Sequence, residues 1–181
     1  MDKTYRDEYQ RLFLIEHLPE PLTRAGRHLQ LFDNYLEDTR LRLRSVRVPE
    51  TREWTRILQQ RFPAGEDGRH WKIAEIHLDD AEYRTLAIFE GSEIRKNRHF
   101  FELGDRQIEI DLFLGTLWGL NLGKVCFETA EASQRFEPAP FMILEVTGEN
   151  FFEGANLVGK NFTDVQAEVA RILENRQADP R

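Results

Sequence analysis

Cysteine and long apolar runs are scarce in this sequence, and each shortage excludes a class of protein. The 181 residues contain one cysteine, Cys126, so no internal disulfide can form, and no Cys/His spacing predicts a zinc site. The apolar runs last only a few residues, far short of the roughly 20 that a helix needs to cross a bilayer. Segment 1–10 also lacks the apolar core of a signal peptide. These shortages predict a cytoplasmic protein with no membrane partner.

Charge is distributed unevenly. The sequence has 25 Lys and Arg residues against 32 Asp and Glu, and its net charge of −7 argues against binding duplex nucleic acid through overall charge. Only five of the 25 basic residues are lysines. Seven arginines fall within residues 40–61: Arg40, Arg42, Arg44, Arg47, Arg52, Arg56 and Arg61. Because a guanidinium group binds phosphate or carboxylate oxygens through two parallel hydrogen bonds, this concentration favours an anion site.

Alternation of apolar and polar residues predicts a series of strands. Segment Arg40–Arg44 is the plainest, since its three arginines share one face and its two leucines the other. Seven further segments are predicted as strands: Tyr9–Ile15, Trp54–Phe62, His70–Leu78, Ile94–Leu103, Arg106–Leu112, Leu122–Glu128 and Phe141–Thr147. Their mostly short connections favour antiparallel pairing. The chain therefore reads as one α+β domain over residues 1–181, built around a sheet or barrel.

Helices are fewer. Asp79 followed by Glu82 predicts a helix start, and Ala130–Arg135 predicts a short helix before a proline. Thr163 with Gln166 predicts the start of a C-terminal helix over about 163–176. Four apolar residues of that helix share one face and are expected to pack on the barrel: Val165, Val169, Ile172 and Leu173.

Several predicted strands carry charges two residues apart, and hence on one face. The pairs are Arg42 and Arg44, Lys96 and Arg98, and Glu109 and Asp111, with Gln59 beside Arg61. Glu145 lies within an apolar run, where an unpaired carboxylate would be costly. An open sheet would leave these charges in solvent and in surface salt bridges. A closed barrel with the same faces inward would form a polar tunnel lined by both signs.

The order of these motifs resembles the CYTH superfamily, the triphosphate tunnel metalloenzymes. This superfamily includes class IV adenylate cyclases and thiamine, inorganic and fungal RNA triphosphatases. The resemblance covers about residues 8–158 and rests on these landmarks in family order: Tyr35-Leu36 followed by Arg42-x-Arg44, Ile94-Arg95-Lys96-Asn97-Arg98, Gly104-Asp105 leading to Glu109-x-Asp111-x-Phe113, Gly119-Leu120, and Glu145-Val146-Thr147 with Asn156-Leu157. It implies an eight-stranded antiparallel closed tunnel barrel with a few flanking helices.

The resemblance also implies roles for individual residues. Five basic residues would hold phosphate oxygens: Arg42, Arg44, Arg61, Lys96 and Arg98. Glu109, Asp111 and Glu145 would be the catalytic acids, and together with Glu8 they would hold Mg²⁺ or Mn²⁺ if the protein is catalytically active.

Four positions depart from the family pattern. The N-terminal Glu-x-Glu-x-Lys strand appears as Glu8-Tyr9-Gln10-Arg11-Leu12, so the second acid and the lysine are replaced. In the later Glu-x-Glu strand, Lys124 and Cys126 stand where acids are expected. Lys124 would add a phosphate-binding cation, whereas an ammonium group cannot ligate a metal and would repel it. A register shift of one residue would turn Lys124 outward, and the sequence leaves that open.

Two functions follow. In the first, the tunnel binds a triphosphate-containing small molecule and hydrolyses it with a divalent metal, the substrate being inorganic triphosphate or a nucleoside triphosphate. In the second, a non-catalytic module binds a nucleotide or another polyanion such as polyphosphate, because the metal-binding acids are partly lost. Adenylate cyclase activity ranks below phosphohydrolase activity. The sequence does not choose between hydrolysis and binding, nor does it set the phosphate compound, the metal count or the oligomeric state.

Overall fold

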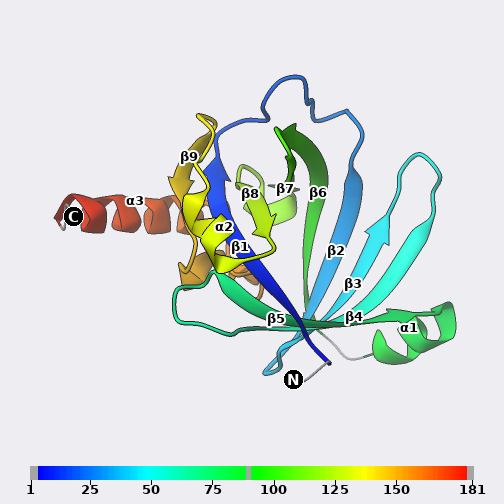
Figure 1. Ribbon diagram of the computed structural model, residues 1–181. Coiled ribbons are helices and arrows are strands. Elements are labelled where there is room, and N and C mark those ends of the chain that lie inside the picture. Colours follow the sequence, from blue (N-terminus) through cyan, green and yellow to red (C-terminus); the bar gives the residue numbers. More distant parts are fainter. Residues whose placement is uncertain (1–3, 89–90, 179–181) are drawn as a thin grey trace.

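Eight strands close into an antiparallel barrel in the computed structural model, which describes residues 4–88 and 91–178 (Figure 1). The strands are β1 (Arg6–Ile15), β2 (Leu29–Leu36), β3 (Leu41–Arg47), β4 (Trp54–Pro63), β5 (His70–Leu78), β6 (Gly91–Leu103), β7 (Arg106–Phe113) and β8 (Asn121–Phe127). Around the ring they run β1-β5-β4-β3-β2-β6-β7-β8 and return to β1. A short ninth strand, β9 (Met142–Glu145), continues the sheet from β1. The predicted eight-stranded closed tunnel is thus confirmed.

Strand β1 closes the barrel. Its first half, Arg6–Tyr9, pairs with β5, and its last residues, Phe13–Ile15, pair with β9. Its other edge pairs with β8 over Tyr9–Leu14. Because side chains alternate along a strand, Glu8, Gln10 and Leu12 on one face of β1 point into the barrel, whereas Phe13 and Ile15 on the other face point outward.

Two apolar clusters lie on opposite sides of the barrel wall. The outer cluster contains Phe13, Ile15, Ile108, Ile110, Leu112, Val125, Phe127 and Met142. Helix α2 (Ala130–Arg135) adds Ala132 to it, with Phe136 directly following. Apolar side chains at alternate positions of β1, β7 and β8 therefore pack outside the barrel and leave the charged positions between them facing inward.

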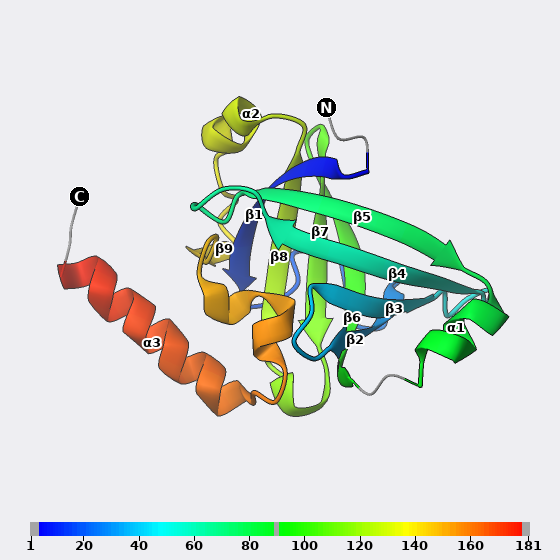
Figure 2. The same ribbon diagram turned by 90° about the horizontal axis from the view of Figure 1, so that it is seen from below.

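The second cluster closes one end of the tunnel. It contains Leu14, Ile94, Phe113, Leu117, Leu120, Leu122, Val146, Phe152, Leu157, Val165 and Ile172. Its members come partly from the short helices η1 (Gly115–Leu117), η2 (Asn150–Phe152) and η3 (Gly154–Leu157). Helix α3 (Phe162–Ala178) contributes Val165 and Ile172, and its C-terminal part runs away from the barrel (Figure 2). Among the described residues, no helix has the length and apolar character that crossing a membrane requires.

The helices follow the expected capping chemistry with one shift. Helix α1 (Asp80–Leu86) begins as predicted, because the Asp79 carboxylate accepts from the backbone of Glu82 while the Glu82 side chain accepts from that of Asp79. Helix α3 is capped by Asn161 and Asp164 rather than by Thr163 and Gln166. Leu173, predicted to pack on the barrel, is 44% exposed.

Strand β2 is absent from the sequence-based prediction. Its sequence, Leu-Gln-Leu-Phe-Asp-Asn-Tyr-Leu, contains Asp33 and Asn34, both of which occur seldom in strands. Asp33 is tolerated there because cations from β3 and β6 surround its carboxylate. The prediction was wrong at β2 because this compensation comes from neighbouring strands rather than from the segment itself.

Candidate triphosphate-binding tunnel

Asp33 on β2 organises one wall of the tunnel. It is completely buried, and Arg44 donates to both of its oxygens, from Nε to Oδ1 at 2.5 Å and from Nη2 to Oδ2 at 2.6 Å. Arg42 donates to Oδ2 at 3.3 Å, and the Lys96 ammonium lies 3.7 Å from it. Burial alone would raise the pKa of Asp33, but the surrounding cations outweigh burial and hold the pKa well below its usual value.

Asp111 on β7 holds the cations of the adjoining wall, as Asp33 does on its own wall. Arg98, its register partner on β6, donates to both carboxylate oxygens at 2.6 and 2.7 Å, and the Lys96 ammonium lies 2.7 Å away. Burial opposes ionisation, yet Arg98 and Lys96 still lower the pKa of Asp111. Burial also lowers the pKa of Lys96 to about 8, although Asp111 and Asp33 partly offset this effect. Lys96 therefore joins the two buried carboxylates and fixes the spacing of the arginines on β3 and β6.

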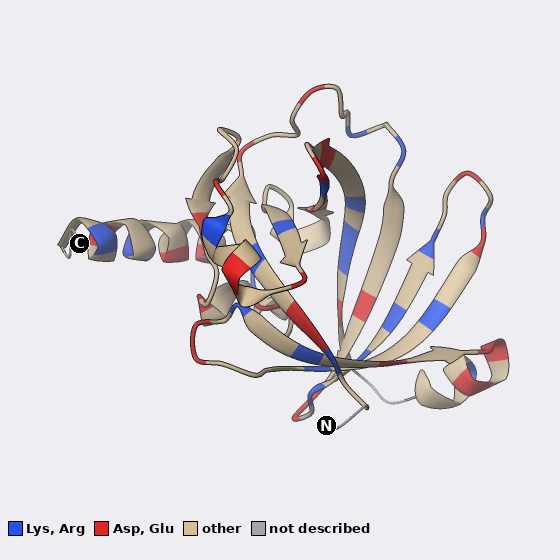
Figure 3. Cartoon of the chain, viewed as in Figure 1, with Lys and Arg blue, Asp and Glu red and all other residues tan. Residues whose placement is uncertain are grey.

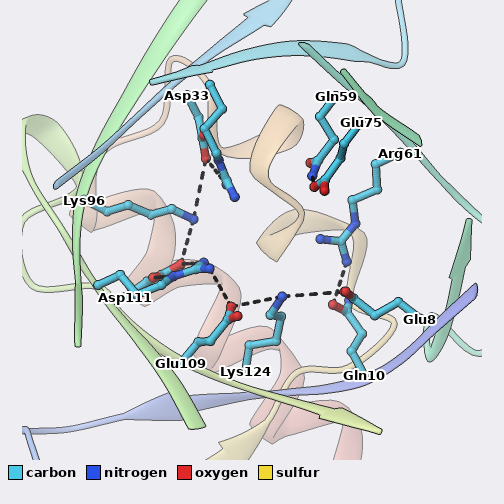
Figure 4. A network of polar contacts seen from close by, with 12 residues as sticks. Glu8, Gln10, Asp33, Gln59, Arg61, Glu75, Lys96, Glu109, Asp111 and Lys124 are labelled. Carbon is cyan, nitrogen blue, oxygen red and sulfur yellow. Dashed lines mark hydrogen bonds and ion pairs between the residues drawn. The ribbon is translucent and has the colours of Figure 1, made fainter. Parts of the chain in front are cut away.

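Lys124 on β8 points into the tunnel, which settles the register that the sequence left open. Its ammonium lies 3.0 Å from Glu109 Oε2 and 3.5 Å from Glu8 Oε1 (Figure 4). Arg6 also binds Glu8, at 2.7 Å. Burial would raise the pKa of Glu8, but the charges of Lys124, Arg61 and Arg6 lower it to about 2. On the wall formed by β1, β8 and β7, ionised carboxylates thus alternate with cations.

Arg61 on β4 differs from the other tunnel arginines. Its guanidinium donates to Gln10 Oε1 at 2.6 Å and stacks on the Trp71 ring, 4.2 Å from the centroid. Within the described part of the chain, no carboxylate oxygen lies within ion-pairing distance of it. Burial and the neighbouring arginines lower the pKa of Arg61 to about 10. Arg61 is therefore a partly buried cation with no ion-pair partner among the described residues.

These side chains surround one cavity of about 320 Å³. The described residues that line it include seven basic side chains: Arg40, Arg42, Arg44, Arg61, Lys96, Arg98 and Lys124. Only Asp111 and Glu153 are acidic lining residues. The ribbon coloured by charge shows basic positions on several strands of the barrel (Figure 3). All six predicted phosphate-binding residues are thus brought together.

Glu145 is the exception among the predicted site residues. It pairs with Phe13 across β1 and β9, so it shares the outward face of Phe13. Arg11 binds both of its carboxylate oxygens, at 2.8 and 2.6 Å, and Thr147 donates to it at 2.8 Å. The prediction that Glu145 lies beside Glu109 and Asp111 was wrong because the register turns Glu145 to the other side of the wall.

Each of the four replaced positions has a defined environment in the structure. Gln10 accepts from Arg61, and Leu12 lines the cavity, whereas Lys124 forms the ion pairs described above. Burial raises the pKa of the Cys126 thiol even though the Lys124 charge opposes it. Cys126 is therefore a neutral thiol rather than an activated nucleophile.

The predicted Mg²⁺ or Mn²⁺ ligands do not assemble into a site. Glu145 lies outside the tunnel, where it binds Arg11. Both oxygens of Asp111 form ion pairs with Arg98 and Lys96. The Lys124 ammonium lies between the carboxylates of Glu8 and Glu109. Within residues 4–88 and 91–178, no three His, Cys, Asp or Glu side chains come together as a metal-ion site. Because a hard cation needs several oxygen ligands and is repelled by an ammonium group, these residues do not fit a resident metal.

Sequence reasoning missed two residues of the site. Asp33 was overlooked with its strand, although Leu31, Asp33 and Tyr35 alternate on one face and would have given the signal. The Trp71 ring stacks against the Arg61 guanidinium. Trp71 lies two residues before Ile73 in the predicted strand His70–Leu78, so the two share one face, and this alternation could have indicated that Trp71 points inward.

The closed antiparallel barrel, whose interior gathers arginine and lysine around a cavity, defines a tunnel fold. No family model matches the chain. An inorganic triphosphatase of Nitrosomonas europaea is 33% identical over 94 residues, which make up 51% of this chain and 62% of that relative. The chain therefore matches less than two thirds of the length of this curated relative.

Solved structures match over a longer span. A crystal structure of an inorganic triphosphatase has a TM-score of 0.56 and 26% identity, covering 84% of this chain and 95% of that chain. A second crystal structure of the same protein gives a TM-score of 0.57 and 25% identity, covering 85% and 99%. These likenesses to an inorganic triphosphatase agree with the resemblance to the CYTH superfamily that the ordered motifs indicate.

Glu145→Gln is expected to weaken the fold without changing the tunnel. The substitution removes a charged acceptor from buried Arg11, which we expect to lower the free energy of unfolding by about 1–3 kcal/mol. Urea unfolding followed by circular dichroism measures this loss, and calorimetric titration with inorganic triphosphate is expected to give the wild-type affinity. A large loss of triphosphate affinity with an unchanged free energy of unfolding would show that Glu145 is part of the binding site.

Proposed function

We propose that the protein binds the triphosphate group of a small molecule in its tunnel and hydrolyses it. The observation that carries this proposal is the convergence of six basic side chains from β3, β4, β6 and β8 on one cavity. The similarity to an inorganic triphosphatase supports inorganic triphosphate as the first substrate to test, with nucleoside triphosphates next. A cytoplasmic location stays a prediction.

Fixed guanidinium groups suit phosphoryl transfer because the reaction depends mainly on positioning and charge stabilisation. Arg44 and Arg98 are each held by a buried carboxylate in a two-point contact, so their remaining donors are oriented before a ligand arrives. Arg61 and Lys124 come from other walls and would bind the same polyanion from the opposite side. We assign any divalent metal to the substrate, as the Mg²⁺ or Mn²⁺ complex of the triphosphate.

Phosphate release from inorganic triphosphate and ATP, in Mg²⁺, Mn²⁺ or EDTA, tests the proposal. Arg42→Gln removes an inward cation of β3 whose Nε is buried without a hydrogen-bond partner, and we expect kcat/KM to fall about 10²-fold or more. Arg47→Gln is the matched control, because Arg47 lies on the same strand, binds Gln30 and does not line the cavity.

Wild-type protein that releases no phosphate above background under every condition would overturn the proposed hydrolysis. Saturable binding without turnover would then favour the non-catalytic polyanion-binding module.

A further inference from the structure

The ammonium group of Lys124 lies between two carboxylates that come from different strands. Glu8 belongs to β1 and Glu109 to β7, and β8, which carries Lys124, runs between them in the sheet. The register sets Lys124 directly beside Glu109 and beside Leu12 of β1. The three side chains are mostly buried, with exposures of 16% for Lys124, 9% for Glu8 and 25% for Glu109.

The carboxylate oxygens that face Lys124 are stabilised by nearby positive charge rather than by hydrogen bonds. Glu8 Oε1 and Glu109 Oε2 are both buried and neither accepts a hydrogen bond of good geometry from the described residues. The Lys124 ammonium lies 3.5 Å from Glu8 Oε1 and 3.0 Å from Glu109 Oε2, and the Arg98 guanidinium lies closer still to Glu109 Oε2, at 2.6 Å. Two buried carboxylate oxygens directed at one point are an arrangement that holds a hard cation. In this chain the ammonium group fills that point.

Lys124 also reaches the cavity that the triphosphate would occupy, since it lines that cavity together with Arg61 and Arg98. An ammonium group has three N–H donors and no acceptor. Two donors can be directed at Glu8 and Glu109, which leaves one for a phosphate oxygen. The lysine is thus placed to hold the acidic wall and the ligand at the same time, as a bridging metal would.

We propose that Lys124 is a built-in cation that replaces a resident divalent metal, so that the tunnel binds free triphosphate without any metal ion on the protein. This inference rests on the proposed function, namely that a triphosphate enters the tunnel. It also accounts for the failure of the acidic residues to assemble a metal site, because a metal placed between Glu8 and Glu109 would meet the Lys124 charge.

Calorimetric titration of inorganic triphosphate into the full chain, in EDTA and in excess Mn²⁺, tests the inference. Wild type is expected to bind in EDTA at least as tightly as in Mn²⁺. Lys124→Glu removes the ammonium and supplies a third carboxylate, so the variant is expected to bind Mn²⁺ itself, detected by electron paramagnetic resonance without triphosphate. Its affinity for triphosphate is expected to fall about 100-fold in EDTA and to recover substantially in Mn²⁺.

Lys72→Gln is the matched control, because Lys72 pairs with Asp7 on the outer surface and does not line the cavity. Wild type that binds triphosphate only when Mn²⁺ is present would overturn the inference and leave the proposed function intact. Wild type that binds triphosphate under neither condition would overturn both. Since the comparison of wild type in the two buffers is decisive alone, the inference stays testable even if Lys124→Glu fails to fold.

Discussion

Asp33→Ala is expected to destabilise the protein more than any other single substitution in the tunnel. Asp33 is fully buried and compensates Arg44, Arg42 and Lys96. Removing one partner of a buried ion pair leaves uncompensated charge in a poorly solvated site, which costs about 3–5 kcal/mol. Thermal and urea unfolding, followed by circular dichroism, would show the lower midpoint directly.

The control for this prediction is Asp7→Ala, since Asp7 forms ion pairs with His70 and Lys72 at a side-chain exposure of 44%. An exposed pair of this kind contributes little to stability. Equal unfolding midpoints for the two variants would show that Asp33 does not organise the tunnel. A further loss of triphosphate binding is expected in any Asp33→Ala protein that still folds, because Arg42 and Arg44 lose their orientation.

Arg61→Gln is expected to weaken triphosphate binding without lowering the stability of the free protein. Arg61 is partly buried against Trp71 and forms no ion pair with a described carboxylate, so its charge costs folding free energy that an incoming anion would recover. A hydrogen bond to a charged group contributes about 1.5–3 kcal/mol, and with the loss of a buried charge we expect triphosphate affinity to fall about 100-fold. The unfolding midpoint of the free protein is expected to stay the same or rise.

Arg56→Gln provides the comparison on the same strand, because Arg56 stacks on Trp54 and Tyr83 and does not line the cavity. Calorimetric titration gives the affinities, and thermal unfolding without ligand gives the stabilities. If Arg61→Gln bound triphosphate as tightly as Arg56→Gln does, Arg61 would not be part of the binding site.

Most of the tunnel lining can be predicted from the sequence, because side chains two residues apart on a strand share one face. Arg42 and Arg44 must share a face, as must Lys96 and Arg98, and closure of the barrel decides only which side that face turns to. The structure turns these pairs inward, and Ile108 and Ile110 pack on the outer side of the same wall.

The remaining features depend on neighbours that are distant in sequence. Asp33 reads poorly as a strand residue until the cations of β3 and β6 are placed beside it. Glu145 could face either side of an apolar run, and only its pairing with Phe13 shows that it faces outward. Lys124 likewise required the register between β7 and β8 before its contact with Glu109 could be known.

We propose that the tunnel holds a chain of three phosphate groups. Calorimetric titration of the wild-type protein with orthophosphate, pyrophosphate and inorganic triphosphate at one ionic strength tests this proposal. Cations on several walls predict one site per chain and an affinity that rises about tenfold or more with each added phosphate. Absent saturation with triphosphate, or equal affinity for all three ligands, would contradict the proposal.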